Sequence, residues 1–592
     1  MADDIRYFGP PPAMSDPHQA EGVPRKRRPD PRPARMPVQR AVGLASVPDE
    51  VLLRHNARVL DAKTAPGLPN FPAPLPTIYL ATELLMPVSR RESLPNYNAV
   101  LKQVGMAIAE PRDEKDRIIS NEFFVKAVLT ASNPKKPAVV DAWLALQTLR
   151  AAVVDPLVEP DPRPAPGEEP VPTLKPQEME GVGLNHLMIG TAMGGLGGAS
   201  GVLQGVPGAV NGGPFSGGST GGDDLGYWRR PVMLEIPRPA RMTDAKVIEA
   251  GKRRPVIAVL DTGIAPNTWL GTPSDDPSNF VVVDEVLQND IDVNNPDEAP
   301  GGSADDPYTT EPLVGELSTH AGHATFIMGL IQQVAPNATV MSIRVMYNDG
   351  IASSGVIAYA LGKLRERVEI AQRGTTPEAK ARTIDIVSLS LGNYIEGDFG
   401  PTELAVLTKA IDDLRKLGVI VVASAGNFAS SRRFFPAALA GRTGGQNPDP
   451  EPDAPPVISV GALNPNRTKT LFSNDNNKDD TWVTCWGRGA ALISTFPEKT
   501  NAARGVAFRV EKPITWPEGV PPEDPINFRE SLESDDYTSG FAMWSGTSFA
   551  TPLVVGKLAQ SLFDNKESTE CEPANTIERA KKAIKDLGGE KT

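Results

Sequence analysis

Five short apolar runs beyond residue 250 constrain the fold of this chain more than any other feature. Each run is hydrophobic without alternation, and segments with helical spacing lie between several of them, such as SGVIAYALGKLRERVEIAQ and ELAVLTKAIDDLRKLG. Strands that are apolar on both faces and alternate with helices are typical of a parallel sheet covered by helices on its two faces. We therefore predict an α/β domain. The runs are RPVIAVLD, TVMSIRVM, IDIVSLSLG, VIVVASAGN and VISVGAL.

The chain has 592 residues, which is too long for one compact core, so several units are expected. Residues 1–70 are rich in Pro, Arg and Ala without sustained periodicity, and we interpret them as a disordered tail. Residues 71–160 carry strand and helix patterns that predict a small α+β unit. Residues 161–225 are dominated by Pro, Glu and Gly, so we expect a linker before the α/β domain at 226–592.

The charge balance limits the classes of partner. The formal net charge of −13 argues against nucleic acid as the main partner, because phosphate binding depends on Lys and Arg. Residues 25–40 are basic but interrupted by proline, and a solvated tail competes with a docking arm as their interpretation. No apolar run reaches the length that crosses a bilayer, and no apolar secretory segment follows the N-terminus. We expect a cytoplasmic protein without membrane or nucleic-acid partners.

Two of the five histidines, His320 and His323, stand three residues apart. This spacing fits a metal-ligand pair, or one catalytic imidazole beside an idle one. Asp261 ends the first apolar run and Ser548 lies near the C-terminus, an order of acid, imidazole and hydroxyl that occurs in serine-hydrolase triads. A serine hydroxyl needs an imidazole to take its proton and a carboxylate to orient that ring. No third ligand stands at a spacing that suits zinc, so no metal site is predicted.

Five blocks of the chain resemble, in the same order, the signature blocks of the subtilisin-like serine proteases. These blocks are DTGI, GHATFIMG, SLSLG, SAGN and GTSFATP, and the resemblance covers roughly residues 250 to 588. It implies a subtilisin-like sheet flanked by helices. It also aligns His323 with the catalytic imidazole of the family, because Gly322 and Gly329 then keep the family register. His320 is left as a neighbour without a required role.

The resemblance implies a role for each catalytic group. Ser548 would be the nucleophile, His323 the general base and then acid, and Asp261 the acid that orients the ring. Asn427 would aim its amide at the oxyanion that forms during the reaction. Trp269 stands where family members often carry an acidic calcium ligand, so that calcium site is not expected.

The resemblance also implies the residues that contact substrate. Ser390, Leu391 and Gly392 would form the strand that pairs with the substrate backbone, in the way that an extended peptide adds to a sheet edge. Phe434, in the stretch FFPAAL, would lie near the floor of the pocket for the residue before the cut. Basic-specific relatives carry acid there, so we expect small or apolar residues at that position.

The activity implied is that of a serine endopeptidase acting on proteins or peptides through an acyl-enzyme, without a cofactor. The order of strands and helices in 71–160 looks like the ferredoxin-like propeptide of many subtilases, which predicts an intramolecular inhibitor. A targeting or partner-binding module is the other interpretation of that unit. The alternative function for the whole chain is a catalytically silent peptide-binding or scaffold protein on the same fold.

Overall fold

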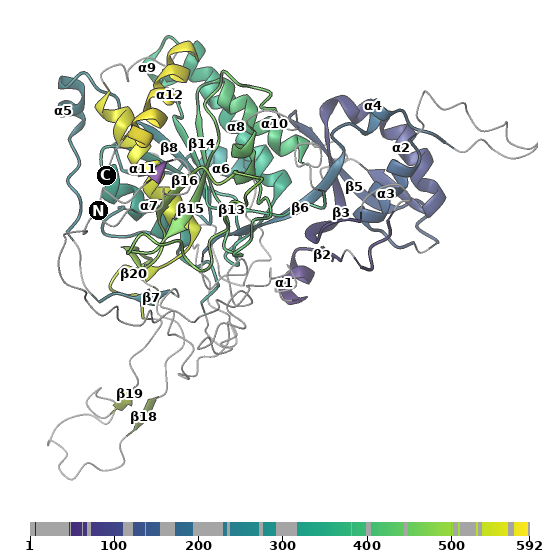
Figure 1. Cartoon of the computed structure of the whole chain (residues 1–592), viewed down its shortest axis with the longest axis horizontal. Coiled ribbons are helices and arrows are strands. Elements are labelled where there is room, and N and C mark those ends of the chain that lie inside the picture. Colours follow the sequence, from purple (N-terminus) through teal and green to yellow (C-terminus); the bar gives the residue numbers. More distant parts are fainter. Residues whose placement is uncertain are drawn as a thin grey trace, which may run out of the picture.

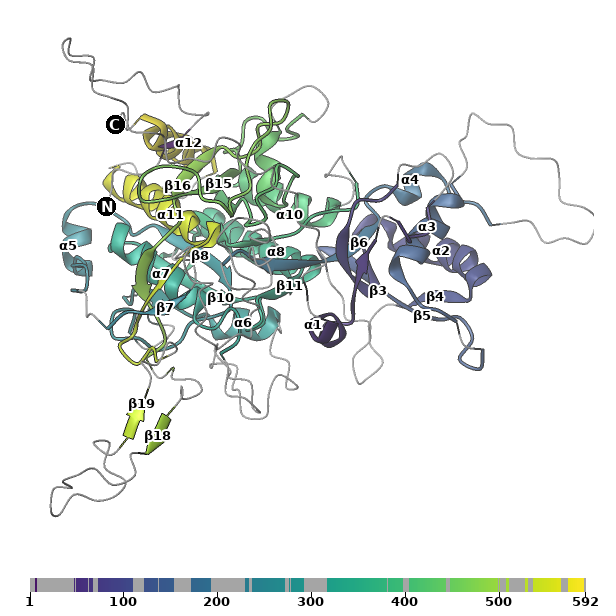
Figure 2. The same ribbon diagram turned by 60° about the horizontal axis from the view of Figure 1, so that its bottom comes forward.

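The structure is a computed structural model with a larger α/β unit and a smaller α+β unit beside it (Figure 1). Strand β6 (Gly183–Gly190) runs from the smaller unit into the larger one (Figure 2). The described residues are 6–7, 47, 49–61, 63–67, 73–109, 122–136, 138–153, 172–192, 229–233, 237–271, 276, 278–291, 317–380, 382–397, 404–442, 448–498, 500, 507–509, 528–530, 536–565 and 573–589.

The larger unit is built on one sheet, whose strands follow the order β1-β16-β15-β14-β12-β8-β10-β9. All neighbouring strands are parallel except β1, which pairs antiparallel with β16 at one edge. The five apolar runs are the strands of its centre, so the predicted parallel sheet is confirmed. The strands are β1 Arg6–Tyr7, β8 Val256–Asp261, β9 Val281–Val282, β10 Thr339–Arg344, β12 Ile386–Leu389, β14 Ile420–Ser424, β15 Ile458–Leu463 and β16 Cys485–Arg488.

Helices cover both faces of this sheet, as the unbroken apolar strands require. In β8, Ala258 and Leu260 pack into one core with helices α8 (Ser354–Arg373) and α10 (Ala405–Lys416). Ile257 and Val259 point to the opposite face and pack into a second core with three other helices. These are α7 His323–Val334, α11 Thr547–Asp564 and α12 Pro573–Gly589.

Shorter elements complete the larger unit. A three-stranded antiparallel sheet has the order β17-β20-β7, and β18 pairs with β19 as a separate hairpin. Their bounds and those of the remaining elements are β7 Arg230–Pro231, β17 Leu492–Thr495, β18 Ala507–Arg509, β19 Phe528–Glu530, β20 Phe541–Trp544, α5 Asp244–Glu249, α6 Glu285–Ile291, α9 Pro377–Lys380 and a 3₁₀ helix at Ala437–Gly441. Within the described residues, no helix combines the length and apolarity that crossing a membrane requires.

The smaller unit has the strand–helix–strand–strand–helix–strand order of a ferredoxin-like fold. Its four strands lie in the order β6-β3-β5-β4, and helices α2 and α3 pack on one face of them. The core elements are β3 Thr77–Pro87, α2 Leu94–Leu101, β4 Met106–Ala109, β5 Phe124–Ala131 and α3 Ala142–Ala151, and the accessory ones are α1 Asp49–Arg54, β2 Ala57–Leu60, α4 Pro176–Met179 and 3₁₀ helices at Val88–Ser93 and Lys102–Val104.

Two segments differ from the sequence-based boundaries. Residues 49–60 belong to the range expected as a disordered tail, yet they form α1 and β2, because β2 finds a partner in the edge of β3. Residues 183–190 belong to the range expected as a linker, yet they form β6, whose eight residues are all buried. The glycine-rich composition of this range favoured the linker interpretation, although residues of both units bury this strand. Residues 193–225 of the predicted linker lie outside the described part of the chain.

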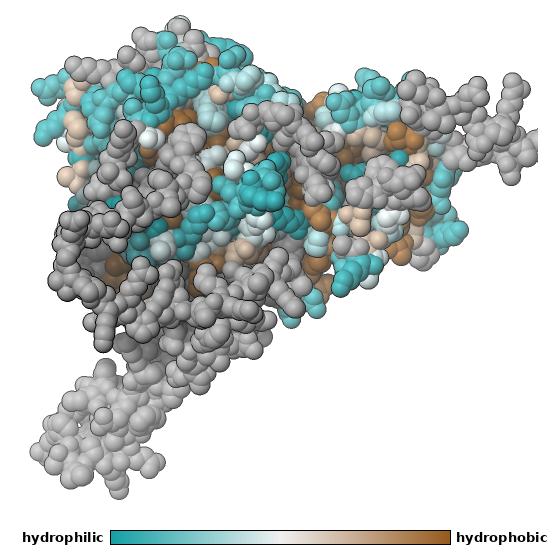
Figure 3. All heavy atoms as spheres, in the orientation of Figure 1, coloured by the Kyte–Doolittle hydropathy of each residue, from teal (hydrophilic) through white to brown (hydrophobic). Residues whose placement is uncertain are grey.

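The outer face of the small sheet packs against the larger unit. Ile78, Leu85 and Phe124 of the small sheet belong to the same apolar core as Ile357 and Leu361 of α8. Figure 3 shows apolar residues gathered where the two units meet, between the more hydrophilic surfaces of each. This contact holds β6 against the carboxyl end of the large sheet, where ligands of open α/β sheets bind.

Candidate active site

An acid and an imidazole meet at the carboxyl end of the large sheet. Asp261 is the last residue of β8, and His323 is the first residue of α7. Gly322, with φ of 74°, makes the turn that starts this helix. The distance between His323 Nδ1 and Asp261 Oδ1 is 2.7 Å, and both side chains are buried. The backbone N–H of Thr262 donates to the same carboxylate oxygen at 2.8 Å, which holds the acid in place.

The Ser548 hydroxyl lies at the same end of the sheet, in the first turn of α11. It does not take the partner expected from the sequence. Its Oγ donates to the carbonyl of Ser390 at 3.1 Å and lies 2.8 Å from the hydroxyl of Thr191. His323 Nε2, the atom that would accept its proton, has no hydrogen-bond partner within the described part of the chain. The Ser548 hydroxyl has this partner because Thr191, in the segment after β6, lies against it.

A proline in helix α11 leaves the carbonyl of Ser548 available to a donor from the neighbouring strand. Pro552 lies inside α11 and has no N–H to donate to the carbonyl of Ser548, four residues earlier. The hydroxyl of Ser390 donates to that carbonyl instead, at 3.0 Å. Ser390 thus contacts Ser548 through two atoms, which fixes the strand end relative to the helix.

Two donors converge on one carbonyl oxygen. Asn427 Nδ2 donates to the main-chain oxygen of Thr191 at 2.5 Å, and the backbone N–H of Ser548 donates to the same oxygen at 3.1 Å. The orientation of the Asn427 amide is set by Thr547, whose backbone N–H and hydroxyl both donate to Asn427 Oδ1 at 3.0 and 2.9 Å. This pair of donors has the form of an oxyanion hole, and a peptide carbonyl of the chain itself occupies it.

The residues expected to pair with substrate pair with β6. Leu391 and Gly392 form strand β13 (Leu391–Gly392), which is antiparallel to β6. The Thr191 N–H donates to the Ser390 carbonyl at 3.1 Å. On the other side, β11 (Ile351–Ser353) pairs antiparallel with β6. The segment therefore lies as an extended peptide between two strands of the larger unit.

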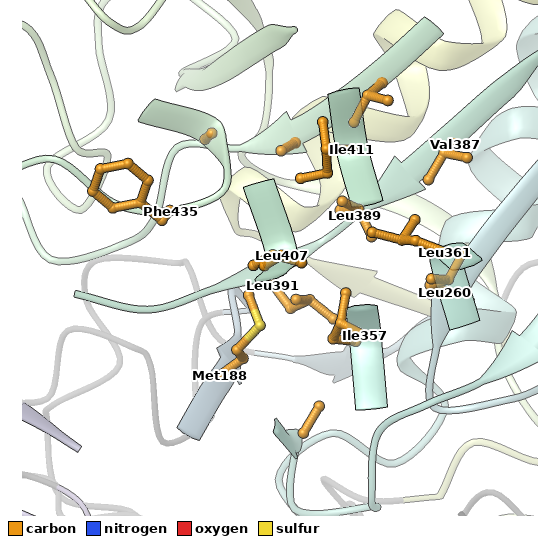
Figure 4. Close-up of a cluster of buried hydrophobic side chains, with 14 of the residues drawn as sticks. Met188, Leu260, Ile357, Leu361, Val387, Leu389, Leu391, Leu407, Ile411 and Phe435 are labelled. Carbon is orange, nitrogen blue, oxygen red and sulfur yellow. The ribbon is translucent and has the colours of Figure 1, made fainter. Parts of the chain in front are cut away.

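Met188 of β6 enters an apolar pocket of the larger unit. Figure 4 shows its side chain beside Leu391 and Leu407, with Ile357 of α8 close by. All four side chains are buried and belong to one core. The side chain that this pocket takes stands three residues before Thr191.

His320, for which the sequence assigned no role, is buried beside the extended segment. The centroid of its ring is 5.1 Å from that of His323. Burial, and secondly the neighbouring imidazole, lowers the pKa of His320 to about 3, so the ring is neutral near pH 7. Phe434 packs between Tyr394 and Phe428, with ring centroids 5.2 and 5.9 Å away.

Sequence reasoning missed Gly190, Thr191 and Ser424. The carboxyl end of β14 presents Ser424, and its hydroxyl lies 2.6 Å from that of Thr191. A usable signal was present, because LNHLMI is a largely apolar run between Gly183 and Gly190 in a range read as linker. Among the described residues, no group of three or more His, Cys, Asp or Glu side chains is arranged to hold a metal ion.

Comparison with known proteins identifies relatives of this chain. The sequence profile of the Subtilase family matches residues 252–590. The Major intracellular serine protease of Bacillus subtilis (strain 168) is 26% identical over 230 residues, which are 36% of this chain and 60% of that protein. Subtilisin E of the same organism is 24% identical over 225 residues, 37% of this chain and 49% of that protein.

The chain spans about half to three fifths of the length of these curated relatives. A solved cold adapted subtilisin-like serine proteinase aligns with a TM-score of 0.30 and 18% identity, over 58% of this chain and 85% of that one. Because the family profile matches more than half of the sequence, the chain belongs to the Subtilase family, a family of serine peptidases.

Proposed function

We propose that the chain is a serine endopeptidase whose small N-terminal unit acts as an intramolecular inhibitor. The observation that carries the proposal is the Thr191 carbonyl, which accepts from Asn427 Nδ2 and from the Ser548 N–H as a scissile carbonyl would. The next residue, Ala192, forms an antiparallel β-bridge with Gly546, as the residue after the scissile bond of a substrate would. Both sides of the Thr191–Ala192 bond are therefore held by the cleft.

The chemistry follows from these positions. The Ser548 oxygen attacks the carbonyl carbon while its proton passes to His323 Nε2, and the carbonyl oxygen becomes an anion between the two donors. His323 then gives the proton to the leaving amine nitrogen as the peptide bond breaks. Water hydrolyses the acyl-enzyme by the same route. Asp261 holds the Nδ1–H tautomer of the ring and stabilises its cation.

Inhibition and self-cleavage use the same contacts. While Thr191 fills the cleft, its hydroxyl and the Ser390 carbonyl hold Ser548 Oγ away from His323. The proposal requires the Ser548 hydroxyl to rotate about its Cα–Cβ bond toward Nε2, and the barrier to such a rotation is small beside that of the reaction. Cleavage then separates Thr191 from Ala192 and releases the covalent restraint on the inhibitor.

Active-site labelling tests the proposal. A fluorophosphonate should label the wild type after incubation, and mass spectrometry should find a fragment that begins at Ala192. The Ser548→Ala variant should show neither the label nor the fragment. The Ser561→Ala variant, changed on the exposed face of the same helix α11, should show both. A folded wild type that is neither labelled nor cut contradicts the proposal.

The alternative function is that of a catalytically inactive peptide-binding protein with the same fold. One observation favours it, because the Ser548 hydroxyl and His323 Nε2 are not hydrogen-bonded to each other in this structure. Labelling separates the two functions. A chain that binds peptides resembling Leu187–Ala192 but resists the fluorophosphonate belongs to the silent class.

A further inference from the structure

The cleft leaves no room for a side chain on the residue at Gly190. A Cβ built on Gly190 would lie 2.6 Å from His320 Nε2 and 2.7 Å from its Cδ2. The imidazole cannot retreat freely, because on its other side a Cβ on Gly350 would lie 2.1 Å from His320 Nδ1. His320 is fully buried between these two glycines. The position before Thr191 therefore accepts only glycine without a shift of this ring.

The buried ring of Phe434 lies against two glycines that are close in the chain to Ser390 and Ser424, the residues that contact the Thr191 side chain. Gly392 of β13 and Gly426, in the loop after β14, both pack against Phe434, because a Cβ on them would lie 2.3 and 3.1 Å from that ring. Phe434 is itself held in the cluster with Tyr394 and Phe428. Because Ser390 and Ser424 each stand two residues from one of these glycines, we expect a long side chain at the position of Thr191 to meet this buried ring.

The remaining space beside Thr191 is polar. Its Oγ1 lies 2.6 Å from the hydroxyl of Ser424 and 3.2 Å from the carbonyl of Ser390. Both residues are buried, so a methyl group in place of the hydroxyl would leave buried oxygens without this partner. The site therefore distinguishes threonine from valine, which has the same shape.

We infer that this peptidase cleaves after a glycine followed by a small hydroxylated residue, Gly-Thr or Gly-Ser, with His320 excluding side chains at the first position and Phe434 and Ser424 selecting the second. The inference rests on the proposed endopeptidase function and deepens it. The substrate class is an extended peptide of this kind, and the chain's own Met-Ile-Gly-Thr segment, residues 188–191, is its first example.

Peptide cleavage by the wild type tests the inference without any substitution. Quenched fluorescent peptides of the sequence LMIGTAMG are offered to the full chain after self-processing, with active sites counted by fluorophosphonate. Serine in place of the threonine should be cleaved at a similar rate, and valine roughly 3- to 10-fold more slowly. Phenylalanine there, or alanine in place of the glycine, should slow cleavage roughly 10- to 100-fold, because each overfills a packed site.

Variants of the chain should reverse these preferences one at a time. Phe434→Ala should raise cleavage of the phenylalanine peptide, and His320→Ala that of the peptide with alanine for glycine. Ser424→Ala should remove the preference for threonine over valine. Phe563→Ala, which deletes an equally buried ring at the far end of α11, should leave the preferences unchanged.

The possible outcomes are distinct. Gains of cleavage on the matching peptides support the inference, and a misfolded variant cannot mimic them. Equal cleavage of all peptides by the labelled wild type overturns the inference and leaves the endopeptidase function standing. A wild type that is not labelled and cuts neither these peptides nor unfolded casein overturns both.

Discussion

The side-chain oxygen of Asn185 in the small unit accepts a hydrogen bond from the backbone N–H of Gly355, 3.0 Å away, in the first turn of helix α8. The hydroxyl of Ser354 donates to the same oxygen at 3.1 Å. Glu83 of β3 orients the amide by accepting from Asn185 Nδ2 at 2.7 Å. The small unit thus supplies an N-terminal cap to a helix of the larger unit, which satisfies a helix N–H that has no partner within its own helix.

Loss of this cap should loosen the small unit. Asn185→Ala removes a helix-capping oxygen, a change that typically costs about 0.5–2 kcal/mol. We expect hydrogen exchange of the β6 amides to accelerate roughly 2- to 30-fold in the Ser548→Ala background, which excludes self-cleavage. Asn96→Ala, which removes an exposed contact with Glu178 inside the small unit, is the matched control. Equal exchange in the two variants would contradict a role for the cap.

Acid should release β6 through the pair of His186 and Glu396. His186 Nε2 lies 2.6 Å from Glu396 Oε2, and both side chains are buried at the contact of the two units. Burial alone would raise the pKa of Glu396, but the charge and hydrogen bond of His186 lower it below its ordinary value. A carboxyl with a lowered pKa stabilises the contact above about pH 4.3, and this stabilisation is lost as the pH falls through the lowered value.

Exchange of the β6 amides at pH 7 and pH 3.5, each corrected for its intrinsic rate, measures this effect. The opening free energy of β6 should be smaller at pH 3.5 in the Ser548→Ala chain. Asp349 adds to the change, because the nearby His55 and Arg54 lower its pKa against the effect of burial. Glu396→Gln should make opening easier at pH 7 and reduce the difference between the two pH values. A pH dependence unaltered by Glu396→Gln would assign the effect to other groups.

Removal of the Asn427 donor should slow the chemical step. Asn427→Leu keeps the approximate side-chain size but leaves the carbonyl oxygen with the Ser548 N–H alone. One such donor is typically worth roughly 10²–10³ in kcat. We expect a loss of this size in kcat for the LMIGTAMG peptide, with a smaller change in KM. Asn464→Leu, in a turn away from the cleft, should retain full activity. A loss confined to KM would show that Asn427 only binds substrate.

The buried carboxylate of Asp385 should stabilise the larger unit. Arg253 binds both of its oxygens, at 2.7 and 2.8 Å, and Arg579 of α12 donates to it at 3.1 Å. Burial opposes ionisation, but chiefly the charge of Arg253 lowers the pKa of Asp385 from 3.8 to about 2. The stability from this shift, about 2 kcal/mol, is present above pH 3.8 and is lost between pH 3.8 and 2.

Denaturant unfolding of the Ser548→Ala chain between pH 2 and 6 measures the stability that the Asp385 carboxylate contributes. Asp385→Asn should lower the free energy of unfolding at pH 6, because it leaves the buried guanidinium of Arg579 and the partly buried one of Arg253 without their anion. It should also reduce the slope of stability against pH between pH 2 and 4. Asp564→Asn, whose carboxylate pairs with Lys252 at the surface, should change neither quantity appreciably.

Much of the larger unit was predictable because its signals are local. Each central strand is an unbroken apolar run, and Asp261, Asn427 and Ser548 stand at the ends of strands or the start of a helix, where side chains of a parallel sheet converge. The choice of His323 over His320 also followed from the residues around it. The structure brings Asp261 and His323 into contact, and it places Leu391 and Gly392 along β6, with Ser390 beside Thr191.

Other features depend on contacts between distant segments, which no local pattern records. Strand β6 was read as linker because its short apolar run lies within a glycine-rich range, and its partners in the larger unit lie more than 150 residues further along the chain. Thr191 and Ser548 are 357 residues apart, so the sequence alone did not reveal that the chain fills its own cleft.

The amino-acid sequence by itself determined the family and the α/β architecture and supplied the candidate catalytic side chains, because these follow from local runs and short motifs. Only the tertiary structure decided which peptide lies in the cleft, which partner the Ser548 hydroxyl takes and which side chains limit the neighbouring positions. The physical reason is that each of these outcomes depends on the exclusion of atoms and on hydrogen bonds between segments that meet only when the chain has folded.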